Sequence, residues 1–424
     1  MRYLYLIVLL IVSFSTEAQT TAYFAEQTMF GTSKWLDSTL QNLLPEYRAI
    51  WQNPKRFKIQ IIYTQIDRDE DQTPHLRHYS YQVDTGSYFY PASTVKLPAC
   101  ALALEYIKNL ETLGVNKFTE VQHIAQGTCQ TSATIDTTTL SYKPSIANYI
   151  KKILLVSDNE AYDRLYELLG QQKLNESLWA KGFLSARLLH RLYHLCSTEQ
   201  NRETNAVIFK QGDSTLCYQP RQKNPNIFRN RFKDFPVSTI NPKTKVTSVR
   251  TYPVEYHTSI SLPDLHKILI AIMLPNCMPD SQRFQISEDD YDFLRKYMGM
   301  YPKESLFPNY QDSLRYPSGF MKYFLYGGIT SQVDSNVRSF NKVGIAWGFA
   351  TDVAYIADFN HNVEFMLSAT IFADSDGDLN DGNNELYLLA LPFLKRLSEV
   401  LLLLEQKRFR LHPPDLEPLK SYFK

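Results

Sequence analysis

A serine and a lysine three positions apart, Ser93 and Lys96, stand at the start of an apolar run that extends to Leu110. Positions i and i+3 share one face of a helix, so Lys96 can reach over the Ser93 hydroxyl if a helix begins here. A neutral amine in a partly desolvated site is a suitable base for a serine that attacks a carbonyl group. The spacing is common, however, and Ser93 alone would also serve as the N-cap of a buried helix. The pair predicts a nucleophile and its base only if other residues support it.

Two later motifs supply that support. Ser157–Asn159 (Ser-Asp-Asn) precedes an amphipathic stretch, and Lys342–Gly344 (Lys-Val-Gly) lies on a predicted strand near the C-terminus. Taken alone, the first is typical of a helix cap and the second of a strand end. The ordered set Ser-x-x-Lys, Ser-Asp-Asn and Lys-Thr-Gly is the signature of class A β-lactamases and penicillin-binding proteins. The chain resembles this superfamily, and most closely the class A β-lactamase-like serine hydrolases.

The resemblance extends over roughly residues 38 to the C-terminal helix. Residues 342–348 and 351–356 are similar to the hairpin that carries the third motif in this family. Residues 174–183 are similar to the helix and turn that follow the second motif. The resemblance therefore implies the family's fold for most of the chain.

The resemblance also implies a role for each matching side chain. Ser93 is the expected nucleophile, which becomes acylated, and Lys96 is expected to accept its proton directly or through water. Ser157 and Lys342 are expected to pass a proton to the leaving nitrogen, and Lys342 to attract a substrate carboxylate. Asn159 is expected to bind the amide side chain of the substrate and Lys96.

Backbone groups are expected to complete the site. The N–H of Ser93, at the start of a helix, would form half of an oxyanion hole. By the resemblance, the N–H of Ile345 forms the other half. Gly344, just before it, lets the strand edge approach the substrate closely.

Two departures from the family pattern concern the substrate and the release of the acyl group. Val343 stands where the family has a hydroxyl residue that helps to bind the carboxylate of a β-lactam or of a terminal D-alanine. Class A enzymes also use a glutamate, on a loop after the second motif, to activate the water for deacylation. Glu199 and Glu203 lie in the corresponding part of the chain and are the candidates for this base, with surface charges as the alternative.

Hydrophobic periodicity predicts an α/β (α+β) fold, and the resemblance implies that it is of the β-lactamase/transpeptidase-like type. We expect an antiparallel five-stranded sheet assembled from both ends of the chain, with a mostly helical subdomain inserted between them. The expected strands are residues 56–67, 75–83, 337–344, 352–359 and 363–372. The expected helices are residues 95–110, 146–155, 161–169, 262–273, 288–298 and 385–406.

The domain organisation starts with an expected signal peptide at residues 1–18. It has an arginine at position 2, a short apolar run and small residues before the expected cleavage site near Gln19. Residues 19–424 are expected to form one serine hydrolase domain. A basic, proline-containing insertion at about residues 207–258 is expected on its surface as an extended segment or a long hairpin.

Charge and composition limit the partners. The chain has 45 Lys+Arg against 44 Asp+Glu, which gives no support to a nucleic-acid partner. No later apolar run is long enough for a transmembrane anchor. We expect a secreted or periplasmic monomer that acts on a small molecule or a cell-wall peptide.

The chain has five cysteines, too few for a disulfide scaffold. Cys100 could pair with Cys129, and Cys196 with Cys217, or each could remain free. Possible metal ligands are few: His190 and His194 are four apart on an expected helix without a third ligand. The acidic loop 374–385 lacks the glycine of a calcium loop and is favoured as a solvated turn. No cofactor and no metal is therefore expected.

Three functions remain open at this point. The first is β-lactam hydrolysis by an exported serine acyl hydrolase. The second is the reaction of a D,D-peptidase or an esterase of the same fold. The third is a non-catalytic module that binds penicillin or the cell wall, and the complete set of polar site residues argues against it.

Overall fold

A five-stranded antiparallel sheet forms the centre of the molecule. The computed structural model describes residues 29–424, except residues 128, 241–246, 375–378 and 380–384. The strand order is β2-β1-β10-β9-β8, so the two strands from the N-terminal part of the chain lie beside the three from the C-terminal part and meet them where β1 pairs with β10. The strands are β1 (Gln60–Arg68), β2 (Pro74–Tyr81), β8 (Val337–Ala346), β9 (Phe349–Asp358) and β10 (Val363–Phe372). The predicted sheet is confirmed.

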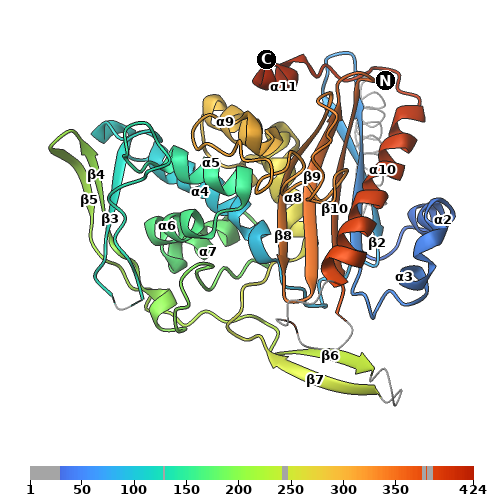
Figure 1. The fold of residues 1–424 in the computed structure, drawn as a ribbon, viewed down its shortest axis with the longest axis horizontal. Helices are drawn as coiled ribbons and strands as arrows, with labels where there is room; N and C mark the ends of the chain where they lie inside the picture. The colour runs from blue at the N-terminus through green and yellow to red at the C-terminus, as the bar shows by residue number, and fades with distance from the viewer. Residues whose placement is uncertain (1–28, 128, 241–246, 375–378, 380–384) are drawn as a thin grey trace, which may run out of the picture.

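The central strands β9 and β10 are buried along their whole length because both faces of the sheet are covered. The outer face, shown in Figure 1, packs against α10 (Leu391–Lys407) and, at one edge, α2 (Lys34–Leu43). The inner face packs against α8 (Leu262–Met273), where the His266 ring bonds Thr64 Oγ1 at 2.8 Å. Alternate residues of each strand thus enter two different cores.

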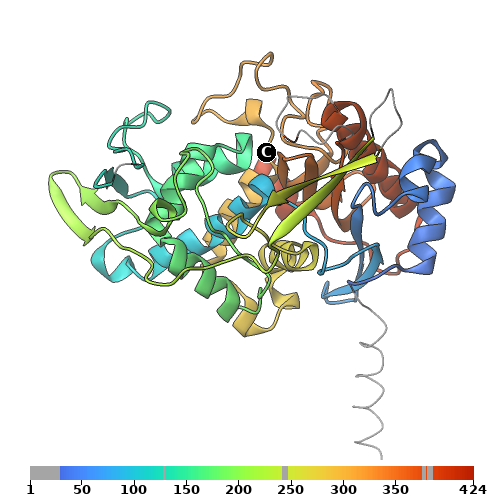
Figure 2. The same cartoon turned by 90° about the horizontal axis from the view of Figure 1, so that it is seen from below.

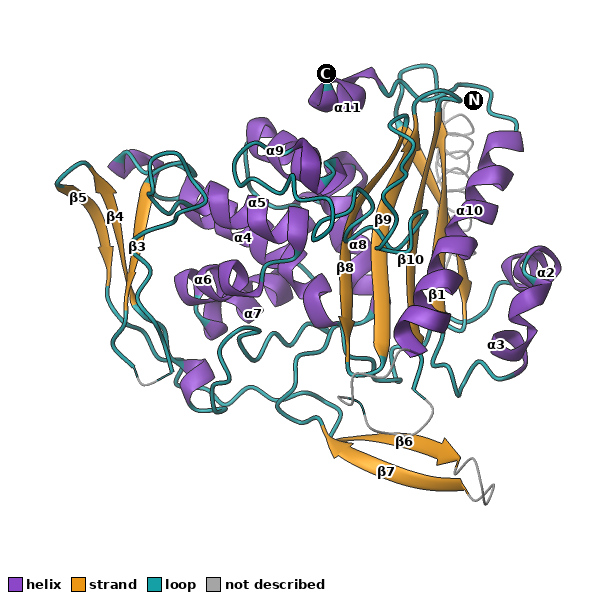
Figure 3. Cartoon of the chain, viewed as in Figure 1, coloured by secondary structure: helices purple, strands orange, loops and turns teal. Residues whose placement is uncertain are grey.

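A helical subdomain lies beyond the inner face, as Figure 3 shows. Its helices are α4 (Lys96–Lys108), α5 (Ile146–Val156), α6 (Asn159–Leu169), α7 (Gln171–Ala180) and α9 (Glu288–Gly299). These agree with the predicted helices, and α7 covers the segment compared with the family's helix and turn. Gly182, just after it, has φ 83°, a conformation that favours glycine at the end of a helix.

The predicted basic insertion folds as two separate parts. Its first part forms β4 (Ala206–Gln211) and β5 (Ser214–Gln219), which pair with β3 (Glu120–Ile124) in a three-stranded sheet. The hairpin of β6 (Asp234–Ile240) and β7 (Thr247–Pro253) follows; it lies below the rest of the fold in Figure 1 and in front of it in Figure 2. Val207, Phe209 and Phe235 are buried. The insertion is therefore anchored in the core rather than lying wholly on the surface.

Shorter helices connect these parts. They are α3 (Arg48–Gln52), α11 (Glu417–Lys420), the π-helical η8 (Leu386–Ala390), and the 3-10 turns η1 (Pro45–Tyr47), η2 (Ala92–Val95), η3 (Glu111–Leu113), η4 (Gln200–Arg202), η5 (Pro275–Cys277), η6 (Asp280–Gln282), η7 (Pro302–Glu304) and η9 (Ser421–Phe423). In the described part of the chain, no helix has the length and apolar character to span a bilayer.

The disulfide in the structure joins Cys129 to Cys196, with the Cα atoms 5.6 Å apart. Neither pairing considered from the sequence is correct, because Cys100 is buried within α4 and Cys217 lies on β5. The expected signal peptide and most of the acidic loop 374–385 lie outside the described residues.

Candidate active site

Ser93 lies in a tight turn that leads into a buried helix. It belongs to η2, and α4 continues directly from Lys96. Ala92, just before it, has φ 46°, which a residue with a Cβ rarely adopts. Backbone strain of this kind collects at functional sites. Ser93 is partly exposed, whereas the residues on either side of it are buried.

The edge strand β8 passes directly beside this turn. A Cβ added to Gly344 would lie 2.3 Å from the Pro91 carbonyl oxygen and 3.0 Å from the Ser93 backbone nitrogen. Only a residue without a side chain allows this approach. The third motif is therefore in contact with the first, although about 250 residues separate them in the sequence.

The second motif forms the turn between α5 and α6. Ser157 has φ 59° and ψ 37° and ends α5, while the Asp158 side chain accepts a hydrogen bond from Ala161 N at 2.8 Å and caps α6. The helix-cap interpretation is thus correct for Asp158. The turn leaves Ser157 and Asn159 free to face Lys96.

Hydrogen bonds join the three motifs. Lys96 Nζ donates to Ser157 O at 2.5 Å and to Asn159 Oδ1 at 2.6 Å, and it lies 3.3 Å from Ser157 Oγ. Lys342 Nζ donates to Ser157 Oγ at 2.8 Å and to Val343 O at 3.0 Å. The Ser157 hydroxyl therefore lies between two amines.

Burial lowers the pKa of both amines, because the charged form loses its hydration in the protein interior. Lys96 is fully buried, and desolvation together with the nearby Lys342 holds its pKa well below the usual lysine range. Burial lowers the pKa of Lys342 to about 7, against the opposing effect of the Asp352 carboxylate. The lowered pKa favours the neutral, basic form of Lys96, and Lys342, with a pKa of about 7, is protonated in about half of the molecules at pH 7.

A second buried hydrogen-bond network surrounds Asn341, the residue before Lys342 on β8, and its Asp352 carboxylate acts electrostatically on Lys342. Asn341 Nδ2 donates to the Asp352 carboxylate at 2.8 and 3.0 Å, and Lys322 Nζ donates to Asn341 Oδ1 at 2.8 Å. Burial raises the pKa of Asp352 to about 6 and lowers that of Lys322 to about 7. The sequence carried no signal for Lys322, because it lies outside any motif and any predicted element.

The Val343 side chain points away from these groups. It is buried in the core beneath α10, on the opposite face of β8 from Lys342 and Gly344. Ile345 follows on the same face as Val343 and is partly exposed. The hydroxyl residue of β8, Ser339, is fully buried on the same face as Val343, so β8 offers the site no side-chain hydroxyl in place of the one that the family has at position 343.

The two candidate glutamates are engaged by cations. Glu199 forms ion pairs with Arg202 at 2.6 Å and with Lys223. The hydrogen bond from Lys223 is the largest cause of the lowered pKa of Glu199, and a more acidic carboxylate is a weaker base. Glu203 pairs with Arg221 and, at 3.5 Å, with Lys223. Within the described residues, neither is hydrogen bonded to the amines around Ser157.

His190 and His194 do not lie on a helix, so that expectation is wrong. The Asp163 carboxylate accepts backbone N–H groups of three successive residues, Leu192, Tyr193 and His194, at 2.7, 3.2 and 3.0 Å, and this holds the segment in an irregular conformation. No group of three or more metal-ligating side chains lies together in the described part of the chain.

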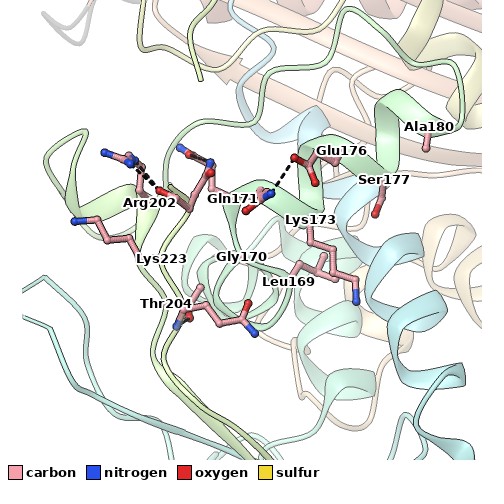
Figure 4. A pocket seen from close by; sticks show the side chains of 13 residues that line it. Leu169, Gly170, Gln171, Lys173, Glu176, Ser177, Ala180, Arg202, Thr204 and Lys223 are labelled. Carbon is pink, nitrogen blue, oxygen red and sulfur yellow. Dashed lines mark hydrogen bonds between the residues drawn. The ribbon is translucent and has the colours of Figure 1, made fainter. Parts of the chain in front are cut away.

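A cavity beside α7 is separate from the site. It has a volume of about 360 Å³. The residues labelled around it in Figure 4 are Leu169, Gly170, Gln171, Lys173, Glu176, Ser177, Ala180, Arg202, Thr204 and Lys223. None of them belongs to the three motifs.

Comparison with known proteins finds one matching family model. Residues 40–216, which include the first two motifs, match the model of the β-lactamase enzyme family. The chain has a β-lactamase-like serine hydrolase fold. No curated protein sequence matches the chain.

Solved β-lactamase structures are similar at low identity. The β-lactamase from Sphaerobacter thermophilus DSM 20745 is 10% identical, with a TM-score of 0.45, over 88% of this chain and 99% of that one. The class A β-lactamase from Clostridium kluyveri DSM 555 is 11% identical, with a TM-score of 0.44, over 84% of this chain and 99% of that one. The β-lactamase from Desulfarculus baarsii DSM 2075 is 13% identical, with a TM-score of 0.43, over 86% and 98%.

Proposed function

We propose that this β-lactamase-like serine hydrolase is exported and hydrolyses β-lactams through an acyl-serine intermediate on Ser93. The observation that carries the proposal is the Ser157 hydroxyl, 2.8 Å from the amine of Lys342 and 3.3 Å from that of Lys96. Such a chain can move a proton between a nucleophile and a leaving group.

In the proposed acylation, neutral Lys96 accepts the proton of Ser93, and the Ser93 Oγ forms a bond to the lactam carbonyl carbon. The oxyanion is stabilised by the backbone N–H groups of Ser93 and Ile345. The carbon–nitrogen bond then breaks, Ser157 donates its proton to the nitrogen, and Lys342 replaces that proton. Asn159 binds the amide side chain of the substrate and keeps Lys96 in place.

An esterase of the same fold is the second candidate, and Val343 is the observation that favours it over a β-lactamase or a D,D-peptidase. A buried valine offers no hydrogen bond to the carboxylate that β-lactams and terminal D-alanine carry. An ester without a carboxylate needs no such group. A binding module is disfavoured because it has no use for two amines held with lowered pKa values.

The deciding experiment uses the mature protein with a fluorescent penicillin and a chromogenic cephalosporin, and the Ser93→Ala variant as the control. Turnover that the variant loses supports β-lactam hydrolysis. A stable label on Ser93 without turnover points to a penicillin-binding protein. If neither reagent labels wild type but a p-nitrophenyl ester does, the esterase is correct.

Export has its own test. We propose that residues 1–18 direct the chain out of the cytoplasm and are removed. N-terminal sequencing of the protein recovered from a periplasmic or secreted fraction is expected to begin near Gln19. A protein that retains Met1 in the cytoplasm would contradict this.

A further inference from the structure

The segment from Leu188 to His194 runs beside the candidate site and is held by its neighbours along most of its length. Its fixed contacts are Leu188 N to Asn175 Oδ1 (2.8 Å), Leu189 N to Thr258 Oγ1 (3.1 Å), Gln171 Nε2 to Leu189 O (2.8 Å), Arg191 N to Asn201 Oδ1 (2.9 Å) and the three N–H groups bonded to Asp163. The disulfide at Cys196 restrains the chain just beyond it. A side chain on this segment is therefore positioned firmly.

His190 carries an unpaired basic nitrogen on this segment. Its Nδ1 lies 2.7 Å from the Arg191 carbonyl oxygen, which can only accept, so Nδ1 carries the hydrogen. In the neutral ring Nε2 then has a free lone pair. No described residue forms a hydrogen bond with Nε2, and the side chain is partly exposed. The Nε2 atom is available to a water molecule.

A cluster of four rings links His190 to the nucleophile. We call it the ring cluster: Tyr90, His190, His257 and Trp347. The Tyr90 ring stacks on His190 with centroids 6.2 Å apart and planes at 11°, and Trp347 lies 5.7 Å from Tyr90 and 4.4 Å from His257. Tyr90 comes three residues before Ser93, and Trp347 three residues after Gly344. The cluster therefore joins His190 to the two chain segments that carry the proposed oxyanion hole.

The charges around His190 leave it neutral near pH 7. Burial is the main effect and lowers its pKa, while the Asp163 carboxylate opposes this. Asp163 also raises the pKa of Lys96, so one carboxylate acts on both groups. The Arg191 guanidinium is turned away, toward Gln200 O at 3.2 Å and Glu203 O at 2.6 Å.

His257 is a poorer base than His190. Its Nδ1 is buried without a hydrogen-bond partner among the described residues, and burial lowers its pKa to about 4. Its ring lies 6.1 Å from His190 and packs edge-on against Trp347. His257 therefore serves to support the ring cluster, and the Tyr90 phenol, which burial keeps un-ionised, cannot act as a base at neutral pH.

We propose that His190 is the general base that activates water for release of the acyl group from Ser93, in place of a glutamate. The inference rests on the function proposed above. Nε2 takes a proton from water, and the water oxygen bonds to the acyl carbonyl carbon. The bond from that carbon to Ser93 Oγ then breaks, the proton passes to Oγ, and the acyl group leaves as a carboxylic acid.

The test compares His190→Asn with the matched variant His194→Asn. An asparagine at 190 keeps an N–H for the Arg191 carbonyl but has no basic nitrogen. His194 lies on the same segment, with Nδ1 3.0 Å from Asp163, and takes no part in the proposed step. Both variants and wild type are acylated with a chromogenic cephalosporin and with p-nitrophenyl acetate, and the Ser93 adduct is followed by intact mass.

In His190→Asn we expect acylation within about threefold of wild type and deacylation at least about 100-fold slower, the usual contribution of a general base. The adduct should accumulate only in this variant. Deacylation by wild type should fall toward acid pH as His190 is protonated, and the variant should lose this dependence. Added imidazole should accelerate deacylation of His190→Ala, which a purely structural role would not explain.

Wild-type deacylation in folded His190→Asn overturns the inference and leaves the proposed function intact. Equal slowing in both variants overturns it too, because the effect then belongs to the segment. If Ser93 is labelled by neither reagent in wild type, the proposed function and this inference both fail. Should His190→Asn not fold, judged by thermal melting, His190→Gln replaces it with the same criteria.

Discussion

At the scale of single residues, the candidate site depends on two lysines whose pKa values are lowered by burial. Lys96 and Lys342 approach the same hydroxyl, that of Ser157, and a low-dielectric interior makes two positive charges at this distance costly. One amine is therefore favoured in its neutral form. The sequence supplied the identities of these residues, and the burial that sets their proton affinities came from the fold.

The pKa of Lys342 predicts a pH dependence that differs between substrates. Its folded pKa is about 7, so the positive charge is present below pH 7 and is lost as the pH rises through that value. For a substrate with a carboxylate, kcat/KM for acylation should fall above pH 7 because the attraction to Lys342 disappears. For a neutral ester the fall should be smaller. Stopped-flow measurements between pH 5.5 and 9 test this, and identical profiles for both substrates would contradict it.

At the scale of elements, the site depends on the contact between β8 and η2. Gly344→Ala places a methyl group against the Pro91 carbonyl and the Ser93 nitrogen, both backbone atoms that cannot rotate away. We expect acylation of Ser93 to fall at least about 100-fold, as when an oxyanion-hole donor is lost. The rate of adduct formation measures this.

A matched control for that change is Gly86→Ala. The added methyl group there meets only the Asp84 side chain, at 3.0 Å. Acylation should stay within about twofold of wild type, as expected for a surface change away from the site. Equal loss in both variants would show that the contact between β8 and η2 is not what matters.

The element α6 positions the segment that carries His190. Asp163→Ala removes the acceptor of the Leu192, Tyr193 and His194 N–H groups. A buried donor left unpaired costs about 1–3 kcal/mol, so we expect the free energy of unfolding to fall by about 3 kcal/mol. Urea denaturation measures the change.

Asp280→Ala is the control for the loss of a carboxylate. Asp280 is exposed and its ion pair with Arg283 spans 2.9 Å. Surface pairs of this kind are worth about 0–1 kcal/mol, so stability should barely change. A similar effect for both variants would mean that Asp163 does not hold the segment.

At the scale of the whole molecule, the disulfide joins the region between β3 and α5 to the segment that follows His190. Cys129 and Cys196 are 67 residues apart, and a crosslink over a loop of this length stabilises a protein by about 2–4 kcal/mol. The Cys129→Ser/Cys196→Ser double variant should lose that amount in urea denaturation. Cys277→Ser, at a free and partly buried cysteine, should lose much less.

An unchanged stability of the double variant would contradict this expectation. It would show that the hydrogen bonds to Asp163 hold the segment without the crosslink. Deacylation measured in the same variant separates the two restraints, because a mobile segment would also displace His190.

Most of the fold was predictable because the spacing of apolar residues along the sequence indicates which face of each helix or strand is buried. The strands β1, β2, β8, β9 and β10 and the helices α5, α6, α8 and α9 lie within a few residues of the predicted ranges. The three-stranded sheet was missed because β3 lies far before β4 in the chain and because the β4–β5 hairpin belongs to the segment that was expected as a surface insertion. The helix expected at His190 was wrong because the hydrogen bonds of Asp163 replaced those of a helix.

The sequence by itself determined the chemical types at the site: a serine and two lysines in motifs ordered along the chain, with a glycine after the second lysine. Only the tertiary structure decided that Gly344 touches the turn of Ser93 and that Ser157 lies between two amines. The tertiary structure also buries the Val343 side chain in the core and stacks the His190 ring on that of Tyr90 in the ring cluster. The physical reason is that side-chain identity is local, whereas burial, proton affinity and contact depend on segments that meet only when the chain folds.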